Sequence, residues 1–480
     1  MTRRLLRLFV LGALVALTVP SIAQAGHQND PRTGNLKPRG HIFEPAVLGG
    51  YPIIGGDQTP DRRIHTDIAF QGDFAFQGNW DGFRIRDISN PDAPSTVSRT
   101  SCDGNQGDVA VYGDILVRAW NTPAGTPGPF GAGLTCDGQA VPAGFEGIHV
   151  FDISDLEDPQ LVADVELSSR VGADAFGCGS HTLTLAPDLD NDRVIVYNQT
   201  SGGPCPFIGM VEVPLDAPQD AQWIGNIPLE HLGATHATHD TGVILGDVNL
   251  LATASHDTAH VFDVGDNEFP GGSLTDPVLL YTVQEPGVGA PAGNWHSAGF
   301  TWDGETLILG WEPGGGLQAE CEASDPDVKK SFFFYDAKTG DKLGQWTLPR
   351  PQGIDENCTL HNYNTVPLKS GRDVLVSGNY QAGVWVVNIT DPANPETIAW
   401  SDPPPEPPIV QPPTDPQFCN TAPQRCPLTG SWSAHWYNRF IYESHIGEGL
   451  NVFALRSLGS PQTVQLDRLN PQTQEFSLEK

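Results

Sequence analysis

Positive charge is scarce in this 480-residue sequence, which has 26 Lys and Arg residues against 58 Asp and Glu residues and a formal net charge of -32. A field of that sign repels nucleic acid and anionic membranes and keeps a protein soluble. We therefore expect no nucleic-acid partner and no membrane insertion. The acidic balance does not identify a chemistry, because an acidic face is usually just a solvated face.

Several common catalytic signatures are absent as well. The sequence has no G-x-S-x-G motif, no P-loop and no dinucleotide-binding glycine pattern, so nothing supports a nucleophile-elbow hydrolase or a nucleotide-binding enzyme. His236 and His239, in the stretch GATHATHDTG, are three residues apart with no Glu between them, which excludes the zinc-protease helix pattern. The stretch DLDND places Asp188, Asp190 and Asp192 alternately in a turn but lacks the glycine and distal Glu of an EF-hand. A Ca²⁺ loop and a plain polar turn both remain open there.

Long apolar runs are missing after residue 25, so no later stretch predicts a membrane helix. The first 25 residues hold three arginines, a short apolar run and an A-x-A sequence ending at Ala25, which is the pattern of a secretory signal peptide. No Cys follows this run to accept a lipid. We expect cleavage after Ala25 and a soluble, secreted monomer.

What the sequence does have is 53 Gly, 42 Pro and a repeated motif. Three segments nearly superimpose: GFRIRDISNPDAP (82–94), GIHVFDISDLEDP (147–159) and GVWVVNITDPANP (383–395). Weaker copies, which bring the number of units to seven, occupy 209–218, 259–270, 331–341 and 449–461. A further pair of short strands around a turn precedes each copy, and four strands in a unit of roughly 45–65 residues is the signature of a propeller blade.

The sequence therefore predicts an all-β fold, a seven-bladed β-propeller with four-stranded antiparallel blades. We expect residues 1–25 to be the signal peptide, 26–60 an N-terminal arm that supplies a missing outer strand, and 61–470 the propeller. Residues 401–428 form a Pro-rich loop between blades six and seven, and 471–480 a C-terminal tail.

The motif copies at 82–94 and 383–395 resemble the repeats of the LVIVD-repeat family, exported bacterial proteins taken to be β-propellers. This resemblance implies the fold and export. It supplies no catalytic residues.

Histidines recur at one position of the blades. The first strand of a propeller blade lines the central channel, and counting back from each first turn places a His at the start of that strand in five blades: His65, His181, His239, His296 and His361. Blade two has Gln106 nearby, and blade seven has His435, whose register is defined only to within about three residues. His236 lies outside this ring, in the loop before His239.

Seven-fold convergence would bring three or four of these imidazoles to a common ion at about 2.0–2.2 Å, and such a ligand set suits Zn, Cu or Fe. The ends of the second strands add His256, Asp257, Glu312 and His445 on the same face. Asp257 or Glu312 would orient an imidazole or act as a general base. The alternative is a ring of structural hydrogen-bonding residues, with the acidic residues simply solvated.

Eight cysteines, none in a C-x-x-C pair, predict four disulfides in an oxidising compartment. All eight fall in loops that map to the same face as the histidines. Sequential pairing joins neighbouring loops every time: Cys102 with Cys136, Cys178 with Cys205, Cys321 with Cys358, and Cys419 with Cys426. Such bridges would hold loops over the channel mouth or protect them from proteolysis.

Two functions follow from these patterns. The first is an exported, disulfide-braced propeller with a histidine-lined, metal-dependent site for a small molecule at the channel mouth. If it is an enzyme, oxidoreductase, lyase and hydrolase chemistry all remain open. The alternative is a non-catalytic extracellular scaffold that binds a protein or polysaccharide through its loops.

Overall fold

The computed structural model describes residues 30–45, 47–48, 62–104, 106–121, 134–142, 144–167, 180–200, 205–234, 237–265, 271–288, 295–313, 321–350, 353, 356–404, 429–456, 458 and 462–478. The predicted signal peptide, His236, Cys178, Cys419, Cys426 and most of the Pro-rich loop lie outside these residues.

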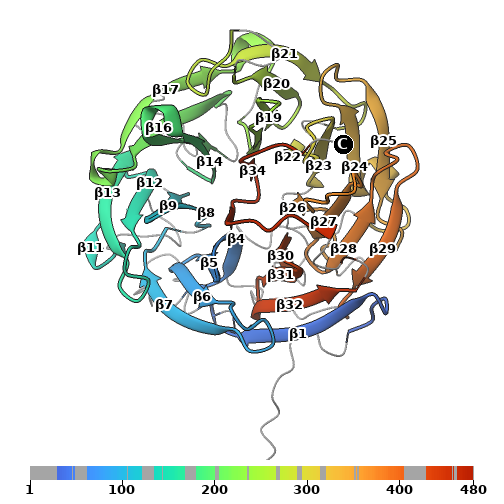
Figure 1. Cartoon of the computed structure of the whole chain (residues 1–480), viewed down its shortest axis with the longest axis horizontal. Helices are drawn as coiled ribbons and strands as arrows, with labels where there is room; N and C mark the ends of the chain where they lie inside the picture. Colours follow the sequence, from blue (N-terminus) through green and yellow to red (C-terminus); the bar gives the residue numbers. More distant parts are fainter. Residues whose placement is uncertain are drawn as a thin grey trace, which may run out of the picture.

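Seven sheets of four antiparallel strands surround a central channel, which confirms the predicted β-propeller (Figure 1). From the channel outward, blade one consists of β4 (His65–Gln71), β5 (Phe74–Asn79), β6 (Gly82–Asp87) and β7 (Ser95–Ser101). Blade two consists of β8 (Val109–Tyr112), β9 (Ile115–Trp120), β12 (Gly147–Asp152) and β13 (Gln160–Glu166). Blade three consists of β14 (Thr182–Asp188), β15 (Arg193–Gln199), β16 (Phe207–Pro214) and β17 (Gln222–Pro228). Blade four consists of β18 (Asp240–Ile244), β19 (Leu250–Ala254), β20 (Ala259–Asp263) and β21 (Val278–Val283). Blade five consists of β22 (Trp295–Phe300), β23 (Thr306–Trp311), β24 (Ser331–Asp336) and β25 (Lys342–Thr347). Blade six consists of β26 (Tyr363–Thr365), β27 (Val374–Gly378), β28 (Val384–Asn388) and β29 (Glu396–Ser401).

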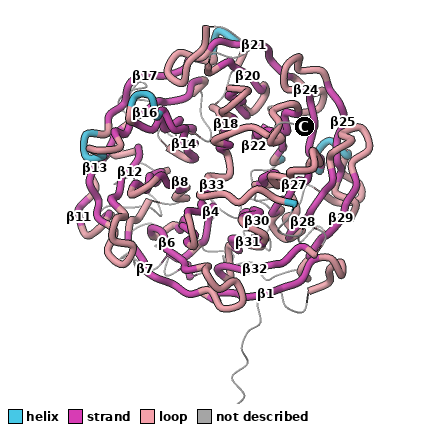
Figure 2. Tube along the Cα trace, in the orientation of Figure 1, coloured by secondary structure: helices cyan, strands magenta, loops and turns pink. Residues whose placement is uncertain are grey.

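Blade seven is built from both ends of the sequence. Its inner strands are β30 (Ser431–Tyr437), β31 (Phe440–His445) and β32 (Gly449–Leu455), and its outer strand is β1 (Leu36–Phe43), which pairs antiparallel with β32. Two small hairpins complete the strands, β2 (Val47–Leu48) with β3 (Arg62–Arg63) and β10 (Thr135–Cys136) with β11 (Gln139–Ala140). The helical segments of the described chain are short 3₁₀ turns such as Leu189–Asn191 (Figure 2).

The repeated motif forms the third strand of a blade and the turn that follows it. In the three good copies the side-chain oxygen of Asp87, Asp152 or Asn388 accepts a hydrogen bond from the backbone N–H two residues on. This local turn is the reason an Asp or Asn followed two residues later by Ser or Thr recurs at the end of these strands. The strand before the turn is almost fully buried in blade one, whereas β7 is half exposed, as expected for the rim of the ring.

The seam between blades seven and one contains a buried ion-pair cluster. Glu44 directly follows β1 and is 3 % exposed. Its carboxylate accepts from Arg84 Nε at 3.0 Å and from Arg86 Nη2 at 2.7 Å, both on β6 of blade one. The N-terminal arm, which supplies the outer strand of blade seven, is therefore also bound to blade one through these ion pairs.

The C-terminal segment enters the channel and lies along the innermost strands (Figures 1 and 2). β33 (Arg468–Leu469) pairs antiparallel with β4, and β34 (Thr473–Gln474) pairs parallel with β18. Asn470 Nδ2 donates to Val111 O in blade two, Thr473 Oγ1 to Leu185 O in blade three, and Gln474 Nε2 to Phe300 O in blade five. This segment thus closes one end of the channel.

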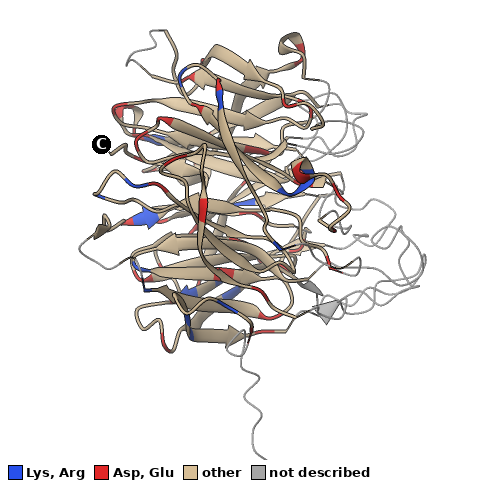
Figure 3. Ribbon diagram, turned by 90° about the vertical axis from the view of Figure 1, so that its right-hand side faces the viewer, with Lys and Arg blue, Asp and Glu red and all other residues tan. Residues whose placement is uncertain are grey.

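Surface charge and disulfides agree with an acidic, cross-linked protein. Asp and Glu residues occur in many of the turns, and the C-terminus lies on one face of the disc (Figure 3). No helix among the described residues has the length and hydrophobicity to cross a membrane. Cys102 is bonded to Cys136 and Cys321 to Cys358, which are two of the four pairs that sequential pairing gives. Cys205 is also disulfide-bonded.

Candidate metal centre

A cavity of about 230 Å³ lies at the end of the channel opposite to the C-terminal segment. The C-terminal strands pair with the last residues of β4 and β18, whereas four histidines of the cavity stand at or before the first residues of the innermost strands: His181, His239, His296 and His361. The lining comprises Thr66, Asp67, Gln106, Asp108, His181, Thr182, His239, His256, His296, Glu312, His361, Asn362, Tyr380 and Trp432.

Four of the five predicted ring histidines come together in this cavity. His181 and His239 directly precede β14 and β18, His296 is the second residue of β22, and His361 lies two residues before β26. They belong to the consecutive blades three, four, five and six. The centroids of successive rings are 4.6, 3.9 and 4.4 Å apart, and all four side chains are buried.

Three of these imidazoles are held by an oxygen acceptor at Nδ1. His361 Nδ1 donates to the backbone carbonyl of Trp432, His239 Nδ1 lies 3.1 Å from Asp240 Oδ1, and His181 Nδ1 lies 3.0 Å from Asn121 Oδ1. A carbonyl or carboxylate oxygen accepts, so the hydrogen is on Nδ1 and Nε2 keeps its lone pair. Metal-binding histidines are oriented in this way in proteins.

The surroundings keep the imidazoles uncharged. Burial lowers the pKa of His239 to about 3 and that of His361 to about 4, and the charge of His256 acts in the same direction at His239. Burial, together with the other rings, holds the pKa of His181 and His296 well below the ordinary value. Neutral imidazole is the form that binds a metal ion.

Glu312 lies between two of the rings. Its Oε2 is 3.6 Å from His296 Nε2, and its Oε1 is 3.6 Å from His361 Nε2 and accepts a hydrogen bond from the Tyr380 hydroxyl at 2.5 Å. Burial raises the pKa of Glu312 to about 8, although the Tyr380 hydrogen bond acts against this. His296 Nδ1 is buried with no hydrogen-bond partner. Ligand atoms of His296, Glu312 and His361 lie within 4.8 Å of one another, as do those of His239, Asp240 and His296.

Blades one and two line the opposite half of the cavity with acids and amides instead of imidazoles. Asp67 accepts from His435 Nε2 at 2.9 Å and from Asn362 Nδ2 at 2.8 Å. Asp108 accepts from two backbone N–H groups, those of Val109 and Leu183. Gln106 lines the same side, while Trp432 forms a wall against His361, with ring centroids 5.0 Å apart. The site is therefore asymmetric.

His65 and His435 lie apart from the four clustered rings. His65 is bonded through Nε2 to Glu44 O at 2.9 Å and through Nδ1 to Asn79 at 3.0 Å, so both ring nitrogens are occupied. His435 lies three residues beyond Trp432, and Trp432 takes the position in blade seven that His361 has in blade six. The bridge between Asn362 and Ser433 establishes this register.

Of the four residues predicted at the ends of the second strands, two line the cavity and two do not. His256 lines the cavity from the turn after β19, where its φ is +49°, and Glu312 lines it from the end of β23. Asp257 and His445 are not among the described residues that line the cavity. Asp240, Asn121 and Trp432 contact the imidazoles but were not singled out from the sequence. Only Asp240 carried a signal, since it follows His239 directly.

The DLDND turn shows no gathered ligand set. Asp188 accepts from Arg193 Nε at 2.8 Å and from Asn191 Nδ2 at 2.8 Å. Among the described residues, Asp188, Asp190 and Asp192 do not form a group with ligand atoms near one another. The plain polar turn, the second of the two interpretations, describes this arrangement.

Comparison with known protein families finds a match to one repeat model, in blade one. Residues 63–101 match the model described as LVIVD repeat, and these residues are the four strands of blade one. The chain carries an LVIVD repeat. In this LVIVD unit the motif 82–94 supplies β6 and the turn before β7.

Two solved structures are similar to this chain at low identity. One, titled the crystal structure of the computationally designed Ika8 protein, is 13 % identical, with a TM-score of 0.43 over 84 % of this chain and 98 % of that chain. The other, titled the structure of the Dos1 propeller, is 10 % identical, with a TM-score of 0.47 over 88 % of this chain and 96 % of that chain. No curated protein matches the chain.

Proposed function

We propose that His181, His239, His296 and His361 bind one transition-metal ion and that the remaining cavity takes a small molecule at an open coordination position. One observation carries the proposal: four neutral, buried imidazoles from four consecutive blades meet at one end of the channel, and three of them are anchored through Nδ1. An imidazole-rich set suits Zn, Cu or Fe. A bound ion of this kind supplies Lewis-acid or redox chemistry.

Glu312 has the role of a positioning residue or general base in this proposal. Its carboxyl group stands between His296 and His361, and Tyr380 holds one oxygen in place. A group with a pKa raised to about 8 can hold a proton near neutral pH and release it to its surroundings. Tyr380 and Glu312 thus form a pair able to carry a proton next to the imidazoles.

The small molecule would occupy the half of the cavity that faces blades one and two. Asp67 and the buried Asn362 Oδ1, which has no donor, offer hydrogen-bond acceptors there, and burial raises the pKa of Asp108 well above its ordinary value, so that its carboxyl group can donate as well as accept. Trp432 offers an apolar surface beside them. This combination fits a small molecule that has hydrogen-bond donors, such as an amine or a hydroxyl compound, and a flat apolar part.

An extracellular location belongs to the same proposal. The disulfides between Cys102 and Cys136 and between Cys321 and Cys358 support it, since such bonds persist in oxidising compartments. The signal-peptide pattern of residues 1–25 is in agreement.

Metal analysis of protein purified without a tag tests the proposal. We expect a stoichiometric transition metal that is lost when His181, His239 and His296 are replaced together by Ala, while circular dichroism shows the fold intact. The matched control is His435→Ala, another buried channel histidine, which should retain the metal. If no transition metal binds under any loading condition, the metal centre is refuted and the non-catalytic scaffold is favoured.

A further inference from the structure

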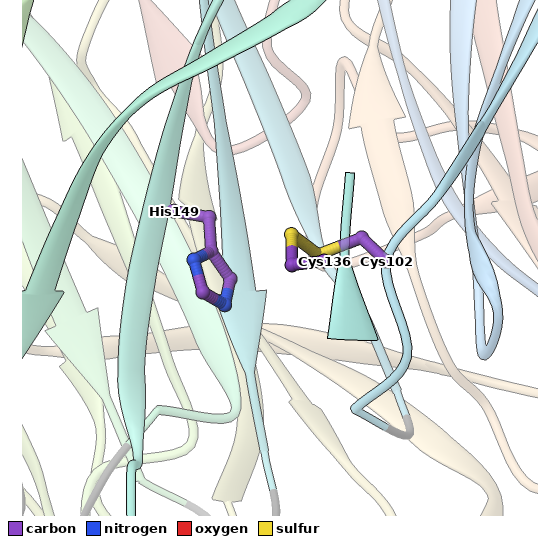
Figure 4. Close-up of side chains that lie close together, drawn as sticks. All are labelled: Cys102, Cys136 and His149. Carbon is purple, nitrogen blue, oxygen red and sulfur yellow. A yellow bond between two sulfur atoms is a disulfide. The ribbon is translucent and has the colours of Figure 1, made fainter. Parts of the chain in front are cut away.

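A second set of metal-ligand atoms lies away from the channel-lining strands. Cys102 follows β7 of blade one, Cys136 is on the β10–β11 hairpin, and His149 is on β12, the third strand of blade two. One ligand atom from each of the three lies within 4.8 Å of the others. Figure 4 shows the imidazole beside the disulfide, and all three residues are buried.

His149 has the same anchored form as the channel histidines. Its Nδ1 lies 2.5 Å from Asp164 Oδ1 on β13, so the carboxylate accepts the Nδ1 hydrogen. Nε2 is buried and has no hydrogen-bond partner. Phe145 stacks on the ring with centroids 4.9 Å apart, and Trp120 packs against it edge-on at 5.2 Å. The imidazole is therefore fixed in place with one nitrogen available.

The charges around the sulfur atoms favour a thiolate. Arg118 Nη1 lies 3.7 Å from Cys102 Sγ, and a nearby guanidinium lowers the cost of deprotonating a thiol. Two thiolates would balance the charge of a divalent ion, so the buried group would be neutral as a whole. Two sulfur ligands and one imidazole form a donor set typical of Zn²⁺.

We propose that Cys102, Cys136 and His149 form a zinc site when their disulfide is reduced. Two molecules of a small thiol deliver two electrons and two protons to the S–S bond, are themselves oxidised to a disulfide, and leave Cys102 and Cys136 as thiols. Binding of Zn²⁺ releases both thiol protons to solvent and joins the two sulfurs and Nε2 of His149 through the ion. Disulfide and zinc exclude each other, and each connects Cys102 to the β10–β11 hairpin.

The test compares the full chain in its air-oxidised form with the same chain reduced anaerobically by a phosphine and then dialysed against zinc. We expect the reduced form to bind one additional zinc ion per chain. With Co²⁺ in place of Zn²⁺, a thiolate-to-cobalt absorption band should appear on reduction. The channel centre has no sulfur ligand, so this band is independent of the function proposed above, and the variants below assign it to Cys102, Cys136 and His149.

Two variants separate binding from folding. Asp164→Asn keeps His149 and its packing but weakens the acceptor at Nδ1, and we expect about 10–100-fold weaker zinc binding, the range for loss of such a partner. His149→Phe should abolish the additional zinc. Replacement of Cys321 and Cys358 by Ser is the matched control and should leave the band unchanged, because no third ligand among the described residues completes a set with that pair. The proposal is refuted if reduction adds no zinc, or if His149→Phe binds zinc as tightly as the unaltered chain.

Discussion

The Nε2 atoms of His181 and His239 lie 3.0 Å apart. Their Nδ1 atoms face Asn121 Oδ1 and Asp240 Oδ1, so each imidazole is oriented with its lone pair toward the other ring. Two lone pairs at that distance repel each other unless a cation lies beside them or one ring changes its tautomer. The metal ion proposed above would remove this repulsion without a change of tautomer.

This relationship predicts that chelators lower the stability of the protein. With free metal at 100 times its dissociation constant, binding adds about 2.7 kcal/mol to the free energy of unfolding. Removal of the metal should lower the melting temperature by a corresponding amount, and re-addition should restore it. In His239→Ala the melting temperature should not respond to chelator; a response of unchanged size would contradict the assignment of His239 as a ligand.

Tyr380→Phe should weaken metal binding without abolishing it. The substitution removes the hydroxyl that donates to Glu312 Oε1 and leaves that carboxyl free to rotate away from His361. We expect a roughly 10–100-fold loss of metal affinity at unchanged stoichiometry, measured by competition with a chromophoric chelator. The control is Tyr363→Phe, because Tyr363 is also buried but donates to Ile308 O. Equal loss in both variants would show that the effect comes from packing alone.

Glu146→Gln should flatten the dependence of stability on pH. Burial, helped by the charge of Glu166, raises the pKa of Glu146 from 4.5 to about 8. Between these values the folded chain keeps a proton that the unfolded chain has lost, so the free energy of unfolding falls as pH rises. The slope is on the order of 1 kcal/mol per pH unit for one such group. Denaturant titrations from pH 5 to 8 measure it. The exposed Glu157→Gln control should retain the original slope, and an unchanged slope in Glu146→Gln would contradict the assignment.

Glu44→Ala should open the seam of the ring. Burial would raise the pKa of Glu44, but the charges of Arg86 and Arg84 lower it overall and keep the carboxylate ionised. Loss of one partner from such a buried cluster costs about 3–5 kcal/mol. Urea denaturation should show this loss, together with faster proteolysis near residue 44. The matched control is Asp92→Asn, because Asp92 pairs with Arg39 at the exposed surface and its loss should leave stability nearly unchanged. An equal free energy of unfolding in Glu44→Ala and Asp92→Asn would contradict the stabilising role of Glu44 in the seam.

The architecture and half of the site could be predicted from the repeats. Asp87, Asp152 and Asn388 each form the same kind of turn in a different blade. Each turn depends only on neighbouring residues, so it leaves a clear pattern in the sequence. The same repetition predicts the position of the first strand, and with it the histidines of blades three to six.

The other half of the site and the position of the C-terminal strands depend on irregularities that the repeats do not encode. A shift in the strand pairing between His65 and Ile68 turns the following Thr66 and Asp67 toward the cavity. In blade seven the residue at the ring position lies three residues earlier than the sequence pattern predicts, so Trp432 takes this position and His435 does not. Strands of two residues, such as β33 and β34, are too short for any alternation of polar and apolar residues, so their place in the channel leaves no pattern to read.

The position of these last strands governs when folding can finish. Blade seven needs residues 36–43 from the beginning of the chain, and the channel needs residues 468–474 from the end. The ring has neither its seam nor its closed channel until these two distant segments have both been made and have paired with the blades. The final step therefore joins parts of the sequence that lie about 400 residues apart for β33 and β4 (Arg468 with Gln71), and contacts of such separation form slowly.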